Sequence, residues 1–278
     1  MNIPCTENAT PHMRGDLLWY SFPLLDAYSD RIIHGFSTRL GGVSEDCFAS
    51  LNLGLGRGDD PEKVQENYRL LGEAAGFEAE RTVISSQTHG VALREVLRAD
   101  EGKGLFRERD YHDIDGLFTR EAGPVLVTTY ADCTPLLFYA PDRHLAATSH
   151  AGWRGTAQKM AAVTVQRLAD EGCDPQQLRV VIGPSAGPLR YEVGSECAEA
   201  FATIRDEAGA VAEPLADKEG KFLLNMWRAN RAVLLEAGVQ PQHIATAGLC
   251  TISHPEIFYS HRICGNQRGS LAAFIALR

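Results

Sequence analysis

The chain has 278 residues, which is long enough to bury a substantial hydrophobic core in one large domain or two small ones. Its net charge of −9, with no cluster of basic residues, argues against general nucleic-acid binding, although a few arginines could still build a local anion site. The seven cysteines include no C-x-x-C pair and no apolar run reaches membrane-spanning length, so we expect a cytoplasmic protein without a disulfide framework, a zinc finger or a membrane segment.

The chain begins with a polar segment, residues 1–15, which we expect to be loosely held. Arg31–Ser37 then has the apolar character of a short strand and runs into a glycine-bearing loop, residues 38–44. Backbone amides and Arg39 could cradle an anion in this loop. The segment by itself favours a plain turn.

A second glycine-rich loop, residues 52–60, precedes the first clear helix. The loop is not a dinucleotide-binding fingerprint, because its glycine spacing differs and no strand comes before it. Asp60 is a typical N-cap, and apolar residues recur at helical spacing from there until Gly76 ends the helix. Thr82–Ser86 follows as a strand, and His89 comes just after it.

Two acidic residues, Asp113 and Asp115, lie beyond a further predicted strand over Val91–Leu97. Their carboxylates could serve a reaction or a metal ion. The sequence Asp-Gly at the entry to an apolar run is typical of a turn that leads into a strand, and we favour that interpretation.

The stretch from Tyr130 to Thr156 carries the strongest chemical pattern of the chain. Three apolar runs predict buried strands: Val125–Thr129, Leu136–Tyr139 and Leu145–Thr148. Cys133 follows the first run and His150 follows the third, so a thiol and an imidazole are both expected at the rim of a sheet. Such a pair suits either a metal site or a Cys/His nucleophile pair. Asp132 could act as a general base, or orient a ligand histidine, or be a simple turn residue.

The second half of the chain continues to alternate helices and strands. We predict helices at Thr156–Glu171, from about Ser195, and at Phe222–Ala237, and strands at Arg179–Ile182, His243–Ala247, Glu256–Ser260 and Leu271–Leu277. No repeat, linker or low-complexity tract interrupts them. The alternation predicts a mixed α/β protein in one domain, residues 1–278.

A series of motifs along the chain resembles a known family. In order they read HGFSTRLGGVS, SLNLG with GDDP, QTHG, DGLFT, ADCTPLL, HAGWRGT, IGP-x-x-GP-x-x-YEVG and a final S-x-R…G-x-x-A-x-x-I-x-L. The set is similar to the purine nucleoside phosphorylase family once labelled multicopper polyphenol oxidase or laccase-domain, the YfiH type. The resemblance extends from about Ile33 to Leu277, and QTHG, ADC and HAGWRG together are highly specific.

The resemblance implies a single-domain, four-layer α/β/β/α sandwich with mixed sheets. It implies a zinc ion held by His89, Cys133 and His150, which would also be the catalytic residues, together with Asp132. The implied substrates are purine nucleosides and phosphate: adenosine, inosine or methylthioadenosine would be cleaved by phosphate, and adenosine would also be deaminated. Three mixed N and S ligands suit a catalytic zinc with an open fourth position.

The resemblance is incomplete at the residues that would handle the phosphate. Arg39, Arg154 and Arg262 match family motifs and are candidate phosphate ligands, since guanidinium groups pair well with oxyanions. Ser270 stands where the family's last Arg is expected, although Arg268 is nearby. Leu189 and Arg190 replace a common pair of cysteines.

Two other functions use the same residues. A cysteine hydrolase would use Cys133 as its nucleophile with His150 or His89 as the base. A metal-dependent module could bind nucleosides or cell-wall precursors without turnover. Copper could also bind two His and one Cys in vitro, but a multicopper oxidase needs many histidines, and the nine in this chain include no H-x-H pair. Metal content distinguishes the first two functions, because a zinc-bound thiolate is not a free nucleophile.

Overall fold

The computed structural model describes residues 3–278, and two six-stranded sheets form its centre. In the order in which the strands pair, the first sheet consists of β1 (Thr10–Arg14), β2 (Leu17–Ser21), β3 (Ile32–Ser37), β17 (Leu271–Leu277), β7 (Val125–Tyr130) and β4 (Thr82–Ile84). The second sheet consists of β16 (Ile244–Thr246), β10 (Arg179–Ile182), β8 (Thr134–Ala140), β9 (Leu145–Ala151), β6 (Gly116–Thr119) and β5 (Leu93–Glu95). Both sheets mix parallel and antiparallel pairs.

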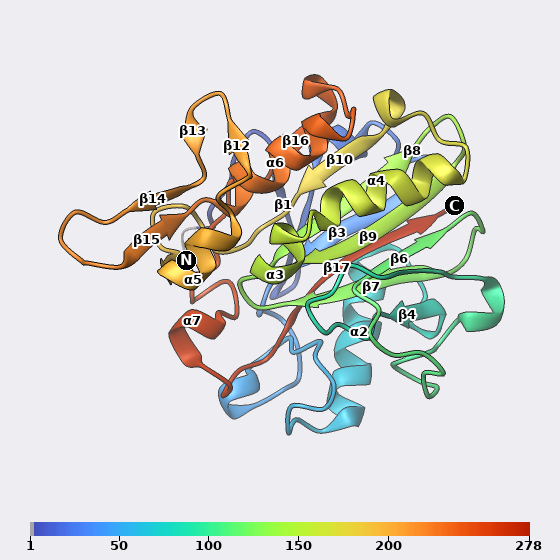
Figure 1. The fold of residues 1–278 in the computed structure, drawn as a ribbon. Helices are drawn as coiled ribbons and strands as arrows, with labels where there is room; N and C mark the ends of the chain where they lie inside the picture. Colours follow the sequence, from blue (N-terminus) through green and yellow to red (C-terminus); the bar gives the residue numbers. More distant parts are fainter. Residues whose placement is uncertain (1–2) are drawn as a thin grey trace.

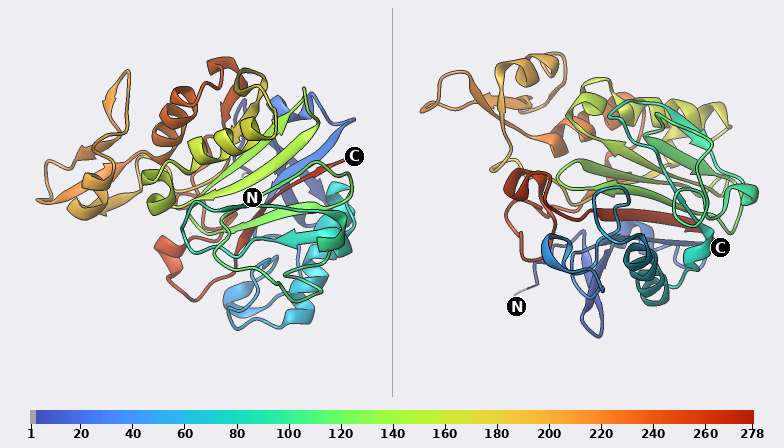
Figure 2. Two further views of the ribbon diagram at one scale, coloured as in Figure 1. Left: turned by 45° about the vertical axis from the view of Figure 1, so that its right-hand side comes forward. Right: turned by 90° about the horizontal axis from the view of Figure 1, so that it is seen from below.

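Helices cover the outer faces of the two sheets (Figures 1 and 2). The helices are α1 (Pro23–Asp26), α2 (Pro61–Ala75), α3 (Trp153–Ala157), α4 (Met160–Asp170), α5 (Ser195–Ala200), α6 (Met226–Glu236) and α7 (His261–Cys264). Helix α2 packs on the first sheet, and α3, α4 and α6 pack on the second. The result is the four-layer α/β/β/α sandwich that the family resemblance implied.

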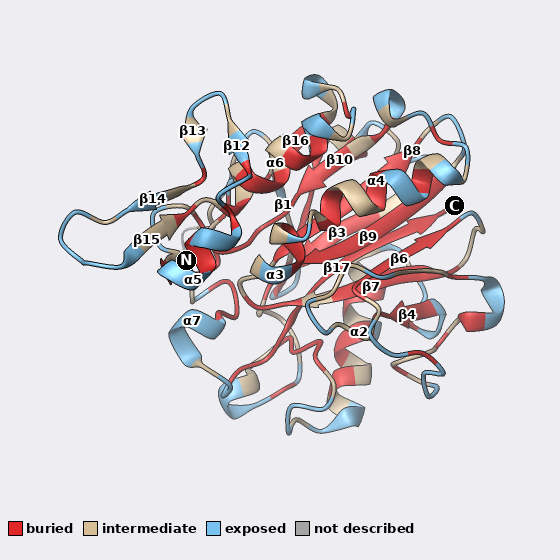
Figure 3. Ribbon diagram, in the orientation of Figure 1, coloured by how far each residue is buried: buried red, intermediate tan, exposed pale blue. Residues whose placement is uncertain are grey.

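The alternation of side chains along the central strands explains the layers. In β7, Leu126 points into the core between the sheets, while Val125 and Val127 point to α2. In β8, Leu137 faces the other sheet and Phe138 faces the outer helices. Because both faces of these strands are covered, they read as continuous apolar runs in the sequence. Figure 3 shows the buried residues concentrated in these strands.

Helix α2 begins and ends where the sequence predicts. The side chain of Asp60 accepts a hydrogen bond from the backbone N–H of Glu62, and Pro61 occupies the first turn. Gly76 ends the helix with a φ of 89°, a left-handed conformation that glycine adopts without strain. Local chemistry therefore fixes both ends of this helix.

Four sequence predictions need correction. The prediction that residues 1–15 are loosely held is wrong for Thr10–Arg14, which pair with β2 along their whole length. Residues 1–2 of that prediction lie outside the described part of the chain. The helix predicted from Thr156 is two helices, broken at Lys159, whose φ is 61°. Phe222–Leu224 belong to a strand, because Asn225 caps α6 and starts the helix later. Residues 256–260 form a turn and an irregular segment rather than a strand, because the backbone N–H groups of Ile257 and Phe258 donate to the carbonyl of His254 and close a turn there.

An arm of short strands projects from the sandwich between α5 and α6 (Figure 1). It contains a three-stranded sheet of β11 (Glu192–Gly194), β15 (Lys221–Leu224) and β14 (Ala212–Pro214), and a pair formed by β12 (Arg205–Asp206) and β13 (Gly209–Ala210). Most of the arm is exposed or half-buried (Figure 3). In residues 3–278 we find no helix with the length and apolar character that crossing a bilayer requires.

Candidate active site

His89, Cys133 and His150 come from three different segments and meet at one end of the sandwich. His89 follows β4, Cys133 lies in the turn from β7 to β8, and His150 is near the end of β9. Their donor atoms all lie within 4.8 Å of one another. The ring centroids of the two histidines are 4.9 Å apart in an edge-on arrangement. The cluster therefore unites residues that are up to about sixty positions apart in the sequence.

Asp132 shapes the turn that presents Cys133. Its φ is 84°, an uncommon left-handed conformation for a residue with a side chain. The carboxylate accepts hydrogen bonds from the hydroxyls of Thr251 and Ser260, at 2.7 and 2.9 Å, and from the backbone N–H of Arg262 at 2.7 Å. These bonds hold the turn in its strained shape. The geometry gives Asp132 a positioning role and leaves its carboxylate little freedom to act as a base.

Asp115 is fully buried behind the cluster and orients its two histidines. Its Oδ1 accepts a hydrogen bond from Nδ1 of His150 at 2.7 Å. The two carboxylate oxygens also accept the backbone N–H groups of Thr88, His89 and Gly90. One carboxylate thus fixes the ring of His150, leaving Nε2 to face the cluster, and also holds the loop that carries His89.

The electrostatics of the cluster favour a thiolate at Cys133. Burial by itself would raise the pKa of the thiol, but the charge of His150 and hydrogen bonds from both histidines outweigh burial and lower it. Burial would lower the pKa of His150, yet the neighbouring Cys133 and Asp115 raise it. The pKa of Asp115 is lowered, because bonds from His150 and the backbone overcome the effect of burial. A thiolate is the form of cysteine that binds a metal or attacks an electrophile.

The cluster has the geometry of a three-ligand metal site. Two ligands bound tetrahedrally to zinc lie about 3.3–3.8 Å apart, so donor atoms within 4.8 Å need only small adjustments. The backbone leaves room for these donors only because residue 152 is glycine. A Cβ at Gly152 would lie 2.4 Å from Nδ1 of His89 and 3.3 Å from Sγ of Cys133.

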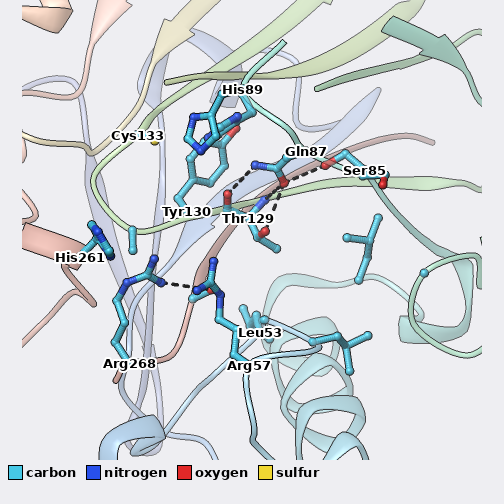
Figure 4. A pocket seen from close by; sticks show the side chains of 18 of the residues that line it. Leu53, Arg57, Ser85, Gln87, His89, Thr129, Tyr130, Cys133, His261 and Arg268 are labelled. Carbon is cyan, nitrogen blue, oxygen red and sulfur yellow. Dashed lines mark hydrogen bonds between the residues drawn. The ribbon is translucent and has the colours of Figure 1, made fainter. Parts of the chain in front are cut away.

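The cluster opens onto a cavity of about 460 Å³, a size typical of small-molecule sites (Figure 4). Its wall includes the three ligand side chains, and it also includes the guanidinium groups of Arg57, Arg109 and Arg268. No carboxylate belongs to this wall within the described chain, although the protein as a whole carries a charge of −9. The cavity is thus a cationic pocket in an acidic protein, which favours an anionic ligand.

The family described as multi-copper polyphenol oxidoreductase laccase matches residues 33–278. The chain belongs to this family. It is 38% identical to purine nucleoside phosphorylase YlmD of Geobacillus stearothermophilus over 255 residues, which cover 88% of this chain and 90% of that protein. It is 35% identical to a purine nucleoside phosphorylase of Deinococcus radiodurans, over 92% of this chain and 93% of the relative.

Two solved structures have the same fold as this chain. The crystal structure of YlmD from Geobacillus stearothermophilus superimposes with a TM-score of 0.87 at 34% identity, covering 98% of this chain and 99% of that one. YfiH of Bacillus licheniformis gives the same TM-score at 31% identity, covering 95% and 97%. The family's name mentions several coppers. The structure of residues 3–278 has one group of three metal-ligating side chains, His89, Cys133 and His150.

The three arginines that the sequence suggested as phosphate ligands lie outside the cavity wall. The guanidinium of Arg39 donates to the backbone carbonyls of Ala49 and Pro255. Arg154 stacks on the ring of Trp153, with its Cζ 4.2 Å from the centroid. Arg262 stacks on a tyrosine and donates to a backbone carbonyl. Each of these side chains has a structural contact of its own.

Sequence reasoning missed four residues of the site, which are Asp115, Arg57, Arg109 and Arg268. Asp115 was interpreted as a turn residue, because the only local feature of its sequence is the Asp-Gly pair that it forms with Gly116. The structure shows instead that its carboxylate binds His150. Arg57 lies in the glycine-rich loop of residues 52–60. The sequence excluded a dinucleotide-binding fingerprint for this loop and predicted no other role for it. Arg268 was noted as a neighbour of Ser270 and given no role. Nothing in the short segments around Arg57 and Arg268 shows that these two side chains meet at one cavity.

Proposed function

We propose that this protein is a zinc-dependent purine nucleoside phosphorylase that acts on adenosine, inosine or methylthioadenosine. The observation that carries the proposal is a single cavity in which metal-ligating side chains and arginines share one wall. Relatives that align over most of their length are named purine nucleoside phosphorylase. We further propose a cytoplasmic location, which suits the seven free cysteines.

The proposed reaction transfers a ribosyl group from a purine to phosphate. A phosphate oxygen forms a bond to C1′ of the ribose while the bond from C1′ to N9 of the purine breaks. The electron pair of that bond leaves with the purine, which takes up a proton, and the products are the free base and ribose 1-phosphate. The transition state has positive charge on the sugar and negative charge on the base, so groups of both signs near the bond accelerate its cleavage.

His89, Cys133 and His150 would hold the zinc ion in this reaction. Zinc supplies a Lewis acid at neutral pH, which stabilises negative charge that develops on a departing base. The chain's own residues keep the site in shape. Asp115 fixes the ring of His150, and Asp132 holds the turn that carries Cys133. The ring of Tyr130 packs 5.5 Å from that of His150 and limits the access of water to its inner side.

Adenosine deamination is a proposed side activity of the same centre. Water would replace the amino group at C6 of the purine, and inosine and ammonia would be released. An open fourth position on a zinc ion is the usual place for the attacking water in zinc deaminases. The H-x-E…P-C-x-x-C signature of those enzymes is absent from this chain, so the support for this activity is the family resemblance.

A cysteine hydrolase is the second candidate, since a half-buried thiol of lowered pKa beside a histidine of raised pKa is also what such an enzyme uses. A module that binds nucleosides without turnover is the third. Zinc content distinguishes the first two, because metal ligation occupies the nucleophile. Tight nucleoside binding without product would favour the third.

The test is incubation of metal-replete protein with adenosine, with and without phosphate, followed by identification of products by mass. Phosphorolysis predicts adenine and ribose 1-phosphate only when phosphate is present. Adenine release that does not depend on phosphate would indicate a nucleoside hydrolase. Protein that carries no zinc after purification, reacts with alkylating agents at Cys133 and releases no base would favour the cysteine hydrolase.

A further inference from the structure

Two arginines from opposite ends of the sequence point toward one another in the cavity (Figure 4). Arg57 lies on the exposed loop that precedes α2, and Arg268 lies just before β17. The two positive charges are close enough for Arg57 to lower the pKa of Arg268. Like charges repel, so the fold holds this pair together at an energetic cost.

Arg268 is buried without full compensation. Only 6% of the residue is exposed. Its Nη1 donates to the backbone carbonyl of Gly269 at 2.9 Å and lies 3.5 Å from the hydroxyl of Ser270. Its Nε is buried and has no hydrogen-bond partner within residues 3–278. Burial and the charge of Arg57 lower the pKa of Arg268 to about 10, which still leaves the guanidinium protonated at neutral pH.

No carboxylate of the described chain neutralises this pair from the cavity wall. The groups that raise the pKa of Arg268 against these two larger effects are Asp132, first, and then the thiols of Cys133 and Cys264. The oxygens of Asp132 are already engaged by Thr251, Ser260 and the backbone of Arg262. An internal ion pair therefore does not explain why a buried guanidinium with a free N–H is aimed into the cavity. A bound oxyanion would satisfy the N–H and offset the repulsion.

We propose that Arg57 and Arg268 form the subsite that binds inorganic phosphate, in place of Arg39, Arg154 and Arg262. This inference rests on the proposed phosphorylase function. Forked guanidinium groups pair with phosphate oxygens through two parallel hydrogen bonds, and a buried fork does so with the least competition from water.

The position of Arg268 explains how the chain can lack the arginine expected at Ser270. The contact between Nη1 of Arg268 and Oγ of Ser270 shows that the two side chains reach the same region. A guanidinium at position 268 can thus serve the space beside position 270, and Arg57 supplies the second charge from the facing loop.

The first test measures phosphate binding directly. Metal-loaded wild type, Arg57→Gln, Arg268→Gln and Arg154→Gln are titrated with inorganic phosphate by calorimetry. Arg205→Gln on β12 is the matched control, because Arg205 is exposed and lies outside the cavity wall. We expect the phosphate Kd to rise roughly ten- to a hundredfold in both cavity variants, as for the loss of a charge-assisted hydrogen bond, and to stay constant in the control. Unchanged phosphate binding in both cavity variants, or a loss confined to Arg154→Gln, would overturn the proposal.

A second arm asks whether the subsite binds free phosphate or the phosphate group of a nucleotide. The same proteins are titrated with adenosine 5′-monophosphate. Loss of nucleotide binding in Arg57→Gln and Arg268→Gln while inorganic phosphate binds as in wild type would refute the assignment to free phosphate. Loss of phosphate binding in the same variants supports it, whatever happens to the nucleotide.

Arg57→Glu guards against a folding artefact, since Arg57 is exposed and its replacement leaves the core intact. The new carboxylate would pair with Arg268. We expect a melting temperature equal to or higher than that of wild type in the absence of phosphate, and no further rise when phosphate is added. A phosphate-induced rise equal to that of wild type would contradict the proposal.

Turnover separates this inference from the proposed function. Phosphate binding that depends on Arg57 and Arg268, in a wild-type protein that releases no base, would support the subsite and refute the phosphorylase. Phosphate-dependent base release with the same phosphate KM in wild type and both variants would support the phosphorylase and refute the subsite. In the expected case the phosphate KM rises in both variants, and the nucleoside KM changes less than threefold.

Discussion

Replacing Asp115 by asparagine tests whether one buried carboxylate organises the whole metal-ligating cluster. Asp115 accepts four hydrogen bonds through two oxygens, from His150 and from three backbone N–H groups. Asparagine has one oxygen and one NH₂ group in the same space. Each carboxylate oxygen of Asp115 accepts two of the four hydrogen bonds. Whichever way the asparagine amide is turned, its NH₂ group therefore faces two hydrogen-bond donors that have lost their acceptor. His150 also loses the negative charge that sets its orientation.

The expected cost has two measurable parts. Each buried donor without an acceptor costs about 1–3 kcal/mol, so two of them lower the free energy of unfolding by about 2–6 kcal/mol. Loss of a carboxylate partner behind a ligand histidine lowers metal affinity about 10- to 100-fold. The first part is measured by urea unfolding of the metal-free protein, and the second by competition with a zinc chelator at pH 7 on protein that is still folded.

Asp113→Asn is the matched control for this substitution. Asp113 is exposed and has a φ of 55°, a conformation that asparagine adopts readily. The control should change neither stability nor metal affinity. If folded Asp115→Asn bound zinc within twofold of wild type, the argument that this carboxylate positions His150 for a metal would be wrong.

Three further outcomes are expected. Cys133→Ala and His150→Ala should each abolish zinc binding in elemental analysis and base release from adenosine, with the fold retained by circular dichroism; Cys47→Ala, at an exposed site, should change neither. Gly152→Ala should lower zinc affinity at least about tenfold, since its Cβ would meet Nδ1 of His89 at 2.4 Å, whereas Gly194→Ala, with open space around it, should be silent. Burial lowers the pKa of His34 to about 4, and the ring of His34 accepts a hydrogen bond from the backbone N–H of Phe22. Between pH 6.5 and 4 the unfolded chain therefore binds more protons than the folded protein. The free energy of unfolding should fall as the pH drops through that window, by at most about 3 kcal/mol. Urea unfolding of His34→Gln should show a smaller loss over the same range, and an equal loss would assign the effect to other groups.

Short-range chemistry in the sequence determined much of the fold. The caps at Asp60 and Gly76 and the buried strands of the centre follow from turn chemistry and from runs of apolar residues, and the structure confirms them. The three candidate metal ligands were also visible, because each lies in a recognisable motif at or just beyond the end of a strand. Phe222–Leu224 show the limit of this approach, since an apolar stretch beside a helix pairs as a strand once a partner strand is near.

Only the tertiary structure decided what surrounds those ligands. Asp115 reads as a turn residue until β6 and β9 pair and bring His150 to its carboxylate. Arg57 and Arg268 are 211 positions apart, and no local pattern shows that their loops face one cavity. Arg39 matches a family motif, yet its guanidinium is taken up by backbone carbonyls that folding delivers from distant loops. Backbone conformation depends mainly on neighbours in sequence, whereas the partners of a charged side chain depend on which loops the packed sheets bring together.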